Sequence, residues 1–415
     1  VGAYVSGGLD SSVIGVFARE QLGDAPLDTF GIGFEEERYD ERPQQRAMAA
    51  IIQSRHHEMI CTGPDIRASL DEVVWHCETP LLRTSPSPMF HLSKSVRDSG
   101  VKTVLTGEGA DELFGGYTLF KEDSIRRFWA KRPDSAMRPA LLSRIHHYVG
   151  SAEARSNALW RDFFGYRLTD TGHPHYAHLV RWRNNSWALR LLAPDVRNAM
   201  SPEVLEESLV RRLPQHWMAY SPLERAQVTE IQTFMTPYLL ASQADRVAMA
   251  HGVEARYPFL DAHVVDFALS LPANLKLRSL SDKILLRRLA ARKLPRDLWA
   301  RKKQPFRAPI ASALLTRDSL EDVAGLLEDS TLIDKKSAGL FLDRVRRRDG
   351  QGLGEREEMG VAGLVTTCML ARRFGDDFES NIQRGVNAIS RRAPSVMIDR
   401  TSAAADEKRR NVGNL

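Results

Sequence analysis

A loop suited to binding an anion lies near the start of the chain, in the stretch SGGLDSS at residues 6–12. The apolar run VGAYV before it predicts a buried strand and the residues from Asp10 to Glu20 predict a helix, so the loop is the turn between them. Backbone amides at a helix start bind anions, and glycines let the backbone approach a ligand closely. The residues that we expect to contact the anion are Ser6, Gly7, Gly8, Ser11 and Ser12.

Asp10 in this loop indicates which anion is bound. A bare carboxylate beside phosphate groups is repulsive unless a divalent cation lies between them. No GxxxxGK[ST] motif occurs in the chain, so the loop is not a phosphate-binding loop of that class. Two glycines after a strand can serve tight packing alone, but the full SGGxDS pattern favours a phosphate ligand with Mg²⁺ bound by Asp10.

A second, acidic turn reads TGEGADELFGGY at residues 106–117 and follows the apolar run VKTVLT. Because parallel strands bring their carboxyl ends to one edge of a sheet, we expect Glu108, Asp111 and Glu112 to approach the same ligand as Asp10. The structural alternative is that these acids only favour the positive end of a helix dipole. Four glycines around three acids favour the ligand-binding interpretation.

Strand-like and helical patterns alternate over residues 1–118. This order predicts a parallel sheet with right-handed crossovers and helices on both faces. We expect residues 119–220 to be a helical insertion, residues 221–375 a helical remainder and residues 376–415 a flexible tail. The runs predicted to be strands are VGAYV (1–5), DTFGIGF (28–34), HEMIC (57–61) and VKTVLT (101–106).

Composition narrows the class of protein. The 415 residues are 43% apolar and 27% charged, with net charge +5 and three cysteines without CxxC spacing, which argues against a disulfide framework or a cysteine zinc site. No apolar run approaches the roughly 20 residues of a membrane span, and the charge does not demand nucleic acid. We expect a soluble cytoplasmic protein, and from the opening strand VGAYV we expect that an upstream portion is absent, although a chain that naturally lacks it is the open alternative.

The loop SGGLDSS resembles the PP-loop of the ATP pyrophosphatase superfamily, and with TGEGADELFGGY the chain is similar to the synthetase domain of the asparagine synthetase family. The resemblance implies an α/β fold with a Rossmann-like parallel sheet of the PP-loop (HUP-like) type and a large all-helical remainder. It covers about residues 1–310. Further matching segments are TFGIGF (29–34), ETPLLRTSPSPM (78–89), QADRVAMAHGVEARYPFLD (243–261), SDKILLR (281–287) and RKKQPF (301–306).

The resemblance assigns roles to single residues. The backbone around Gly31 and Ile32 reads the adenine of ATP, and Gly107 joins the nucleotide site. Lys283, expected on a helix, stabilises the departing pyrophosphate. Asp10 and Asp111 hold Mg²⁺, and Glu108 is the base; the catalytic residues are thus Asp10, Glu108 and Lys283.

The implied reaction is the ATP-dependent amidation of aspartate by ammonia through β-aspartyl-AMP, releasing AMP and pyrophosphate. The related β-lactam-forming synthetases have tyrosine where this chain has Glu108, so amidation is preferred over ring closure. The glutaminase domain of the glutamine-dependent enzymes is not recognised in this sequence, so free ammonia is the expected donor. Whether the chain forms a homodimer is left open.

Three other functions compete with this one. The substrate loop RTSPSP leaves open an enzyme of the same mechanism that amidates another carboxylate in secondary-metabolite or polysaccharide biosynthesis. A tRNA-modifying enzyme shares the SGGxDS loop, but TGEGADELFGGY and GVEARYPFLD count against it. A scaffold without activity is disfavoured by the intact residues Asp10, Glu108, Asp111 and Lys283.

The remaining motifs have structural interpretations. The histidines of HPHYAH (173–178) are expected at the surface or at helix caps, not on a metal. The run RVRRRD (344–349) is expected on a solvated helix face. Met235 and Met249 are expected in the core, and Cys61 and Cys77 as buried small apolar groups. The charged residues of the segment 243–261 are predicted to form a buried ion-pair network: Asp245, Arg246, Glu254, Arg256 and Asp261.

Overall fold

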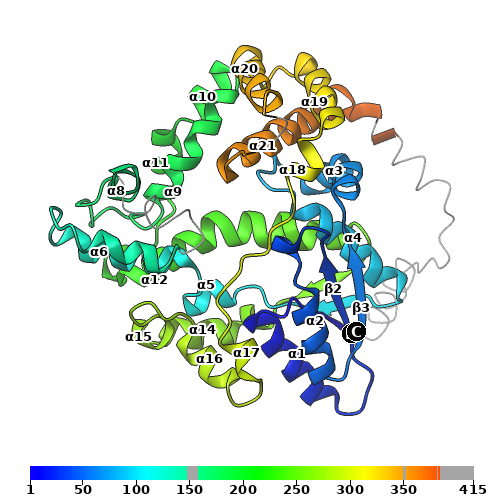
Figure 1. Ribbon diagram of the computed structural model, residues 1–415, viewed down its shortest axis with the longest axis vertical. Helices are drawn as coiled ribbons and strands as arrows, with labels where there is room; N and C mark the ends of the chain where they lie inside the picture. The colour runs from blue at the N-terminus through cyan, green and yellow to red at the C-terminus, as the bar shows by residue number, and fades with distance from the viewer. Residues whose placement is uncertain (147–157, 349–351, 381, 384–415) are drawn as a thin grey trace, which may run out of the picture. The chain divides into compact units, whose positions relative to one another are not determined.

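A five-stranded parallel sheet with strand order β3-β2-β1-β4-β5 organises the computed structural model. The structure describes residues 1–146, 158–348, 352–380 and 382–383. In Figure 1, β2 and β3 lie side by side next to α1 and α2. The strands are β1 (Gly2–Tyr4), β2 (Asp28–Gly33), β3 (Arg55–Ile60), β4 (Thr103–Leu105) and β5 (Glu254–Arg256).

The four apolar runs of the sequence form β1 to β4, so the predicted fold class is confirmed. The fifth strand was not predicted. It pairs with β4 through residues about 150 positions later in the chain, and both Glu254 and Arg256 in it are exposed. An edge strand of this kind carries no apolar run by which it could be recognised.

Helices cover both faces of the sheet because its strands alternate apolar side chains between them. On one face, α1 (Leu9–Leu22) and α2 (Arg42–Ile51) belong to a core that includes Ile14 and Met48. On the other face, α3 (Gly63–Cys77) and α4 (Pro86–Asp98) contribute Ile66 and Leu92 to a core with Phe30. Each crossover returns the chain to the amino edge of the sheet, so that β1 and β4 both run toward the opposite, carboxyl edge, where the two predicted ligand-binding turns follow them.

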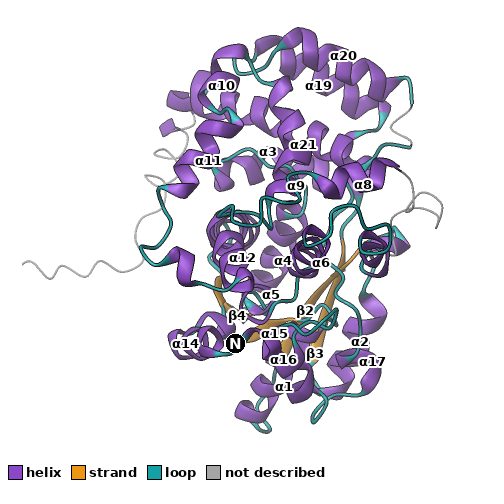
Figure 2. Ribbon diagram, turned by 90° about the vertical axis from the view of Figure 1, so that its left-hand side faces the viewer, coloured by secondary structure: helices purple, strands orange, loops and turns teal. Residues whose placement is uncertain are grey.

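Most of the remaining described chain is helical (Figure 2). The residues divide into two compact units, Val1–Leu370 and Ala371–Leu415, of which the second contains a π-helical turn, Arg372–Asp376. Much of the predicted tail, residues 381 and 384–415, lies outside the described residues. From the acidic turn (residues 106–117) onward, the described α-helices, together with the long π-helix η5, are α5 (Ala110–Phe114), α6 (Thr118–Ala130), α8 (Ala158–Gly165), α9 (Leu179–Asn185), α10 (Pro194–Ala199), α11 (Pro202–Val210), α12 (Pro222–Glu230), η5 (Ile231–Asp245), α13 (Arg246–Met249), α14 (Ala262–Ser270), α15 (Ala273–Lys276), α16 (Ile284–Ala290), α17 (Arg296–Trp299), α18 (Ala311–Leu314), α19 (Arg317–Asp329), α20 (Lys335–Arg346) and α21 (Glu355–Ala371).

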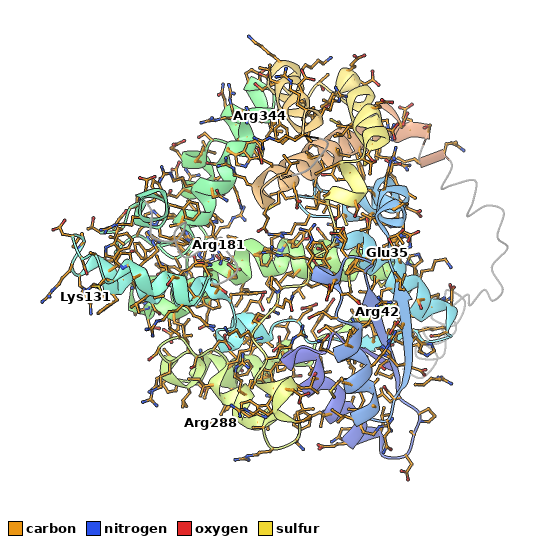
Figure 3. All side chains as sticks on the ribbon, in the orientation of Figure 1. Glu35, Arg42, Lys131, Arg181, Arg288 and Arg344 are labelled. Carbon is orange, nitrogen blue, oxygen red and sulfur yellow. The ribbon has the colours of Figure 1, made fainter. Side chains whose placement is uncertain are left out.

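Several single-residue expectations can be compared with the burial of the side chains. Cys61 and Cys77 are buried as predicted, and so is Met235. The expectation for Met249 is wrong, because 61% of this residue is exposed at the end of the short helix α13. Arg344, labelled in Figure 3, is exposed on α20. Among the described residues, no helix combines the length and the apolar character needed to cross a bilayer.

A buried carboxylate joins the starts of β2 and β3. Asp28 accepts hydrogen bonds from Arg55 Nε at 2.5 Å and Nη2 at 2.8 Å, and its Oδ1 lies 2.7 Å from His57 Nε2. The hydrogen bond from Arg55 is the main cause that lowers the pKa of Asp28 to about 2. This pair therefore stabilises the register of the two strands at neutral pH.

We predict that Asp28→Asn lowers the stability of the protein by about 1–2 kcal/mol at pH 7. An unfolded aspartate has a pKa of about 3.9, so the contribution of a carboxylate with a folded pKa of about 2 is complete above pH 4 and is lost as the pH falls toward 2. Urea unfolding at several pH values measures this. The gap between variant and parent should close in acid, while Asp24→Asn, at an exposed position, should show no gap; a gap independent of pH would contradict the ion pair.

Candidate active site

The loop SGGLDSS, which is predicted to bind phosphate and is called the phosphate loop below, is the turn between β1 and α1, and its own side chains hold it in shape. Ser6 Oγ lies 3.0 Å from Ser11 Oγ and accepts a hydrogen bond from the Gly8 amide at 3.2 Å. Gly7 has a φ of 72°, in the left-handed region that favours glycine. The first helical turn of α1 has no side-chain cap, so its amides are not satisfied by a capping side chain.

Asp10 and Asp111 meet at one ammonium group. Lys283 Nζ lies 2.6 Å from Asp10 Oδ2 and 2.6 Å from Asp111 Oδ1, and only 2% of the lysine side chain is exposed. Asp10 is in the first turn of α1, Asp111 is in α5, and Lys283 directly precedes α16. The structure thus brings the two predicted motifs and the predicted lysine together, across 273 residues of sequence.

Two glycines permit this close contact. A Cβ on Gly116 would lie 2.0 Å from Asp111 Oδ1 and 2.1 Å from Lys283 Cε, so any side chain there would push the ion pair apart. A Cβ on Gly107 would lie 2.8 Å from the Ser11 amide nitrogen, which shows how closely the acidic turn packs on the phosphate loop. These contacts explain why the turn TGEGADELFGGY needs glycines on either side of its three acids.

The sequence predicted that Lys283 lies on a helix. In the structure it instead occupies the position directly before α16 begins. Its φ is 48°, in the left-handed region, which costs free energy for a residue with a side chain. The neighbouring Asp282 is buried and accepts hydrogen bonds from Arg287 Nη2 at 2.6 Å and from Lys121. These contacts hold the backbone in the conformation that points Lys283 at the two carboxylates.

A second lysine, Lys303, reaches the same carboxylates and was not predicted as a site residue. Its Nζ lies 2.6 Å from Asp111 Oδ2 and 3.9 Å from Asp10 Oδ2. It is part of an irregular segment whose position is set by Arg287, which donates to the carbonyl oxygens of Trp299 and Arg301. The basic stretch RKKQPF was recognised as a segment that matches the family. An irregular segment has no periodicity, however, so the sequence could not show which of its cations points inward.

Electrostatics separates the acids of the turn. Burial alone would raise the pKa of Asp111, but Lys283 and Lys303 together lower it to about 2, so this carboxylate is ionised at neutral pH. Burial raises the pKa of Glu108, with the charges of Asp111 and Asp10 acting in the same direction and Lys303 opposing them. A half-buried carboxyl of raised pKa is suited to accepting a proton.

Glu112 does not join the other acids, and the expectation that it approaches the same ligand is wrong. Successive residues of a helix point about 100° apart, so Glu112 turns away from the side of α5 that carries Asp111. Its Oε1 accepts a hydrogen bond from Tyr117 at 2.7 Å, and burial raises its pKa to about 8. Gln227 of α12 donates to the carbonyl oxygens of Glu112 and Leu113 and anchors this short helix from behind.

Most of the predicted residues line one cavity of about 1170 Å³, a volume that includes space open to solvent. Gly7 and Ser12 of the predicted set do not line it. One part of the wall is apolar and aromatic and includes Phe34, Tyr39 and Phe306, whereas the ionic cluster forms another part. The predicted residues that do line the cavity are Ser6, Gly8, Asp10, Ser11, Gly31, Ile32, Gly107, Glu108, Asp111 and Lys283.

The donor set at the ionic end suits Mg²⁺ that is shared with phosphate. Carboxylate oxygens are hard ligands, and Mg²⁺ commonly uses one or two of them together with waters and phosphate oxygens. Asp10 and Asp111 supply two carboxylates that reach the same lysine nitrogen. No group of three or more His, Cys, Asp or Glu residues that could hold a metal ion is found in the described part of the chain, so an all-protein metal cage is not formed there.

Two other predicted clusters differ from expectation. The histidines of HPHYAH are buried rather than exposed: His178 Nε2 lies 2.6 Å from Glu230 Oε2, His175 Nδ1 lies 3.1 Å from Thr229 Oγ1, and His173 contacts Glu206. The spacing of the histidines in the sequence could not predict their carboxylate partners, because Glu206 and Glu230 each lie at least 30 residues away along the chain.

The charged residues of segment 243–261 form separate contacts instead of the predicted buried network, and Arg246 pairs with Glu78 of a distant segment at 3.4 Å. Glu254 and Arg256 pair at 2.6 Å with more than half of each side chain exposed. Asp245 accepts a hydrogen bond from Tyr257, and Asp261 caps α14 by accepting from the His263 amide. Because β5 lies at the sheet edge, its charged side chains remain in solvent instead of beneath the site.

The chain is similar to known proteins along most of its length. The model of a family described as asparagine synthase matches residues 1–366. A putative glutamine-hydrolysing asparagine synthetase of Mycobacterium tuberculosis (strain ATCC 25618 / H37Rv) is 29% identical over 374 residues, which are 83% of this chain and 51% of the relative. Asparagine synthetase [glutamine-hydrolyzing] 1 of Bacillus subtilis (strain 168) is 28% identical, covering 80% of this chain and 49% of its own length.

A relative with a different printed function is also similar. Amidase chry2 of Gibberella zeae is 26% identical over 413 residues, or 90% of this chain and 59% of the relative. The chain therefore spans about half the length of the synthetases and somewhat more of the amidase.

We predict that Gly116→Ala destabilises the protein by about 1–3 kcal/mol, because the added methyl group overlaps Asp111 and Lys283. The matched control is Gly325→Ala on the exposed face of α19, where no atom lies within 4 Å of an added Cβ. Thermal unfolding of both variants measures the difference. Equal midpoints for the two would show that the ion pair tolerates the methyl group and does not require the close packing described.

Proposed function

Since the chain belongs to the asparagine synthase family, we propose that it catalyses the ATP-dependent amidation of aspartate to asparagine through β-aspartyl-AMP. The nitrogen comes from ammonia, or from glutamine when a glutaminase domain accompanies the chain. The observation that carries the proposal is the meeting of Asp10 and Asp111 at Lys283 in the cavity that also contains Glu108. We place the reaction in the cytoplasm.

The cavity is arranged to accept ATP with its ends in different surroundings. The phosphate loop and the lysines would bind the polyphosphate, and the wall beside Gly31 and Ile32 would take the base. Lys283, together with Lys303, would stabilise the charge that develops on the departing pyrophosphate. Both lysines already face the carboxylates, so little side-chain ordering is needed for this role.

Asp10 and Asp111 would hold Mg²⁺. When bound, the ion offsets the negative charge that accumulates between the phosphates and the attacking carboxylate. The low pKa of Asp111 keeps this ligand ionised over the physiological range.

The chemistry has two steps. An oxygen of the aspartate side chain attacks the α-phosphorus of ATP, and the bond from that phosphorus to the bridging oxygen of pyrophosphate breaks. Ammonia then attacks the activated carbonyl carbon, a proton leaves its nitrogen, and the bond from carbon to the oxygen of AMP breaks. Glu108 is positioned in the cavity and has a raised pKa, so we assign to it the acceptance of that proton.

A second candidate is an enzyme of the same mechanism that amidates another carboxylate. The similarity to amidase chry2 over 90% of this chain favours keeping it. The two candidates share adenylation by ATP but differ in the acid that triggers it.

The test is pyrophosphate release from ATP and Mg²⁺ with ammonium, measured with and without aspartate, and with asparagine detected by mass. Release that depends on aspartate and yields asparagine supports the first candidate. Binding of ATP without any response to aspartate would overturn it and favour the second, for which other carboxylates would then be screened.

We predict that Asp10→Asn lowers the rate of adenylation 100-fold or more, because the substitution removes the carboxylate that would hold Mg²⁺ and that pairs with Lys283. Pyrophosphate release measures the loss, and Asp24→Asn serves as the charge-matched control at an exposed position. Release at the parental rate in Asp10→Asn would remove Asp10 from the mechanism.

We predict that Glu108→Gln still forms the acyl-adenylate but transfers nitrogen 100-fold or more slowly, because a glutamine side chain cannot accept the proton. Exchange of labelled pyrophosphate into ATP reports the first step, and asparagine formation reports the second. In the parent, asparagine formation should fall in acid with an apparent pKa above the usual value for glutamate. An unchanged asparagine yield at saturating ammonia in the variant would exclude Glu108 as the base.

A further inference from the structure

Gln45 of α2 is a buried amide whose orientation is fixed by the backbone. Only 2% of the residue is exposed, and its Nε2 donates a hydrogen bond to the carbonyl oxygen of Ile32 at 2.9 Å. A carbonyl oxygen can only accept, so the amide nitrogen must face Ile32 and the amide oxygen must point the other way.

That oxygen, Gln45 Oε1, is buried and has no hydrogen-bond partner among the described residues. It lies over the α-carbon of Gly31, since a Cβ built there would be 2.2 Å from it. His56 Cε1 lies 2.9 Å from the same Cβ position, and His56 Nε2 is also buried without a hydrogen-bond partner among the described residues. A buried acceptor without a donor is costly, and native structures rarely leave one unless a ligand or water satisfies it.

The oxygen belongs to the part of the cavity that is expected to take the base. Gln45 lines the cavity together with Gly31 and Ile32, and Phe34 and Phe306, with ring centroids 6.2 Å apart, line the same cavity. The charged groups that suit phosphates are the separate cluster around Lys283. An acceptor at this place selects for a base that presents a donor.

We propose that Gln45 is a specificity-determining residue, whose Oε1 accepts a hydrogen bond from the exocyclic amine of a 6-aminopurine nucleotide. The inference rests on the proposed function, because it requires that the cavity binds ATP. It adds a side-chain acceptor to the backbone contacts expected at Gly31 and Ile32. A 6-oxopurine would place a lone pair against the lone pairs of Oε1, and a purine without a 6-substituent would leave Oε1 unpaired.

The test is the dissociation constant of ATP, ITP and purine riboside triphosphate, measured by calorimetry for the parent, Gln45→Met and Gln44→Met. The parent should bind ATP at least about tenfold more tightly than either analogue. Gln45→Met keeps the length of the side chain but has no amide oxygen, so its preference for ATP over purine riboside triphosphate should fall to near one. Gln44→Met should keep the parental preference, because Gln44 Oε1 on the same helix is likewise buried without a partner among the described residues but Gln44 does not line the cavity.

Each outcome decides the inference. Equal binding of the three nucleotides by the parent would overturn it without any variant, as would a preference that survives in Gln45→Met or is lost in Gln44→Met. A parent that binds ATP but releases no pyrophosphate with any carboxylate would overturn the proposed function alone. A parent that binds no ATP would overturn both.

Discussion

The contact of Lys283 with Asp10 and Asp111 is the interaction on which the site depends. Three buried charged groups are stable together only when each is paired, and removal of one would leave the others uncompensated in a poorly solvated place. The pairing explains the left-handed backbone at Lys283, the small residue at Gly116 and the close packing of Gly107 on the phosphate loop. Each of these features is unfavourable or restrictive by itself, but each is required for Lys283 to contact both carboxylates.

Behind the ionic cluster, a second layer of contacts sets where its members stand. Asp282 and Arg287 form one buried pair that acts on both lysines: the aspartate neighbours Lys283 in sequence, and the arginine holds the carbonyl oxygens next to Lys303. Gln227 does the same for α5, which carries Asp111. The helical part of the chain is therefore more than a cover for the sheet, since it supplies the contacts that aim the charged groups.

The sequence predicted what local pattern determines and missed what distant pairing determines. Four strands, the phosphate loop and the convergence of Asp10 with Asp111 could be predicted, because apolar runs, glycines and the topology of parallel sheets act over short stretches. Strand β5, the inward position of Lys303 and the buried contact of Glu112 with Tyr117 could not, because an edge strand and an irregular segment have no periodicity, and successive side chains on a helix point about 100° apart. The buried histidines of HPHYAH failed for the same reason: their partners Glu206 and Glu230 are far along the chain.

The order of the site residues along the chain also has a consequence for synthesis. Asp10, Asp111, Lys283 and Lys303 stand at four widely separated positions, so a growing polypeptide presents both carboxylates long before either lysine has left the ribosome. Contacts of such long sequence separation close last and slowly. The sheet can assemble from its first four strands while β5 and the two lysines are still being made, and the nascent chain must keep two acids solvated during that interval. The candidate site is therefore a late product of translation, completed only when residue 303 has emerged and the segment around it has folded back onto the sheet.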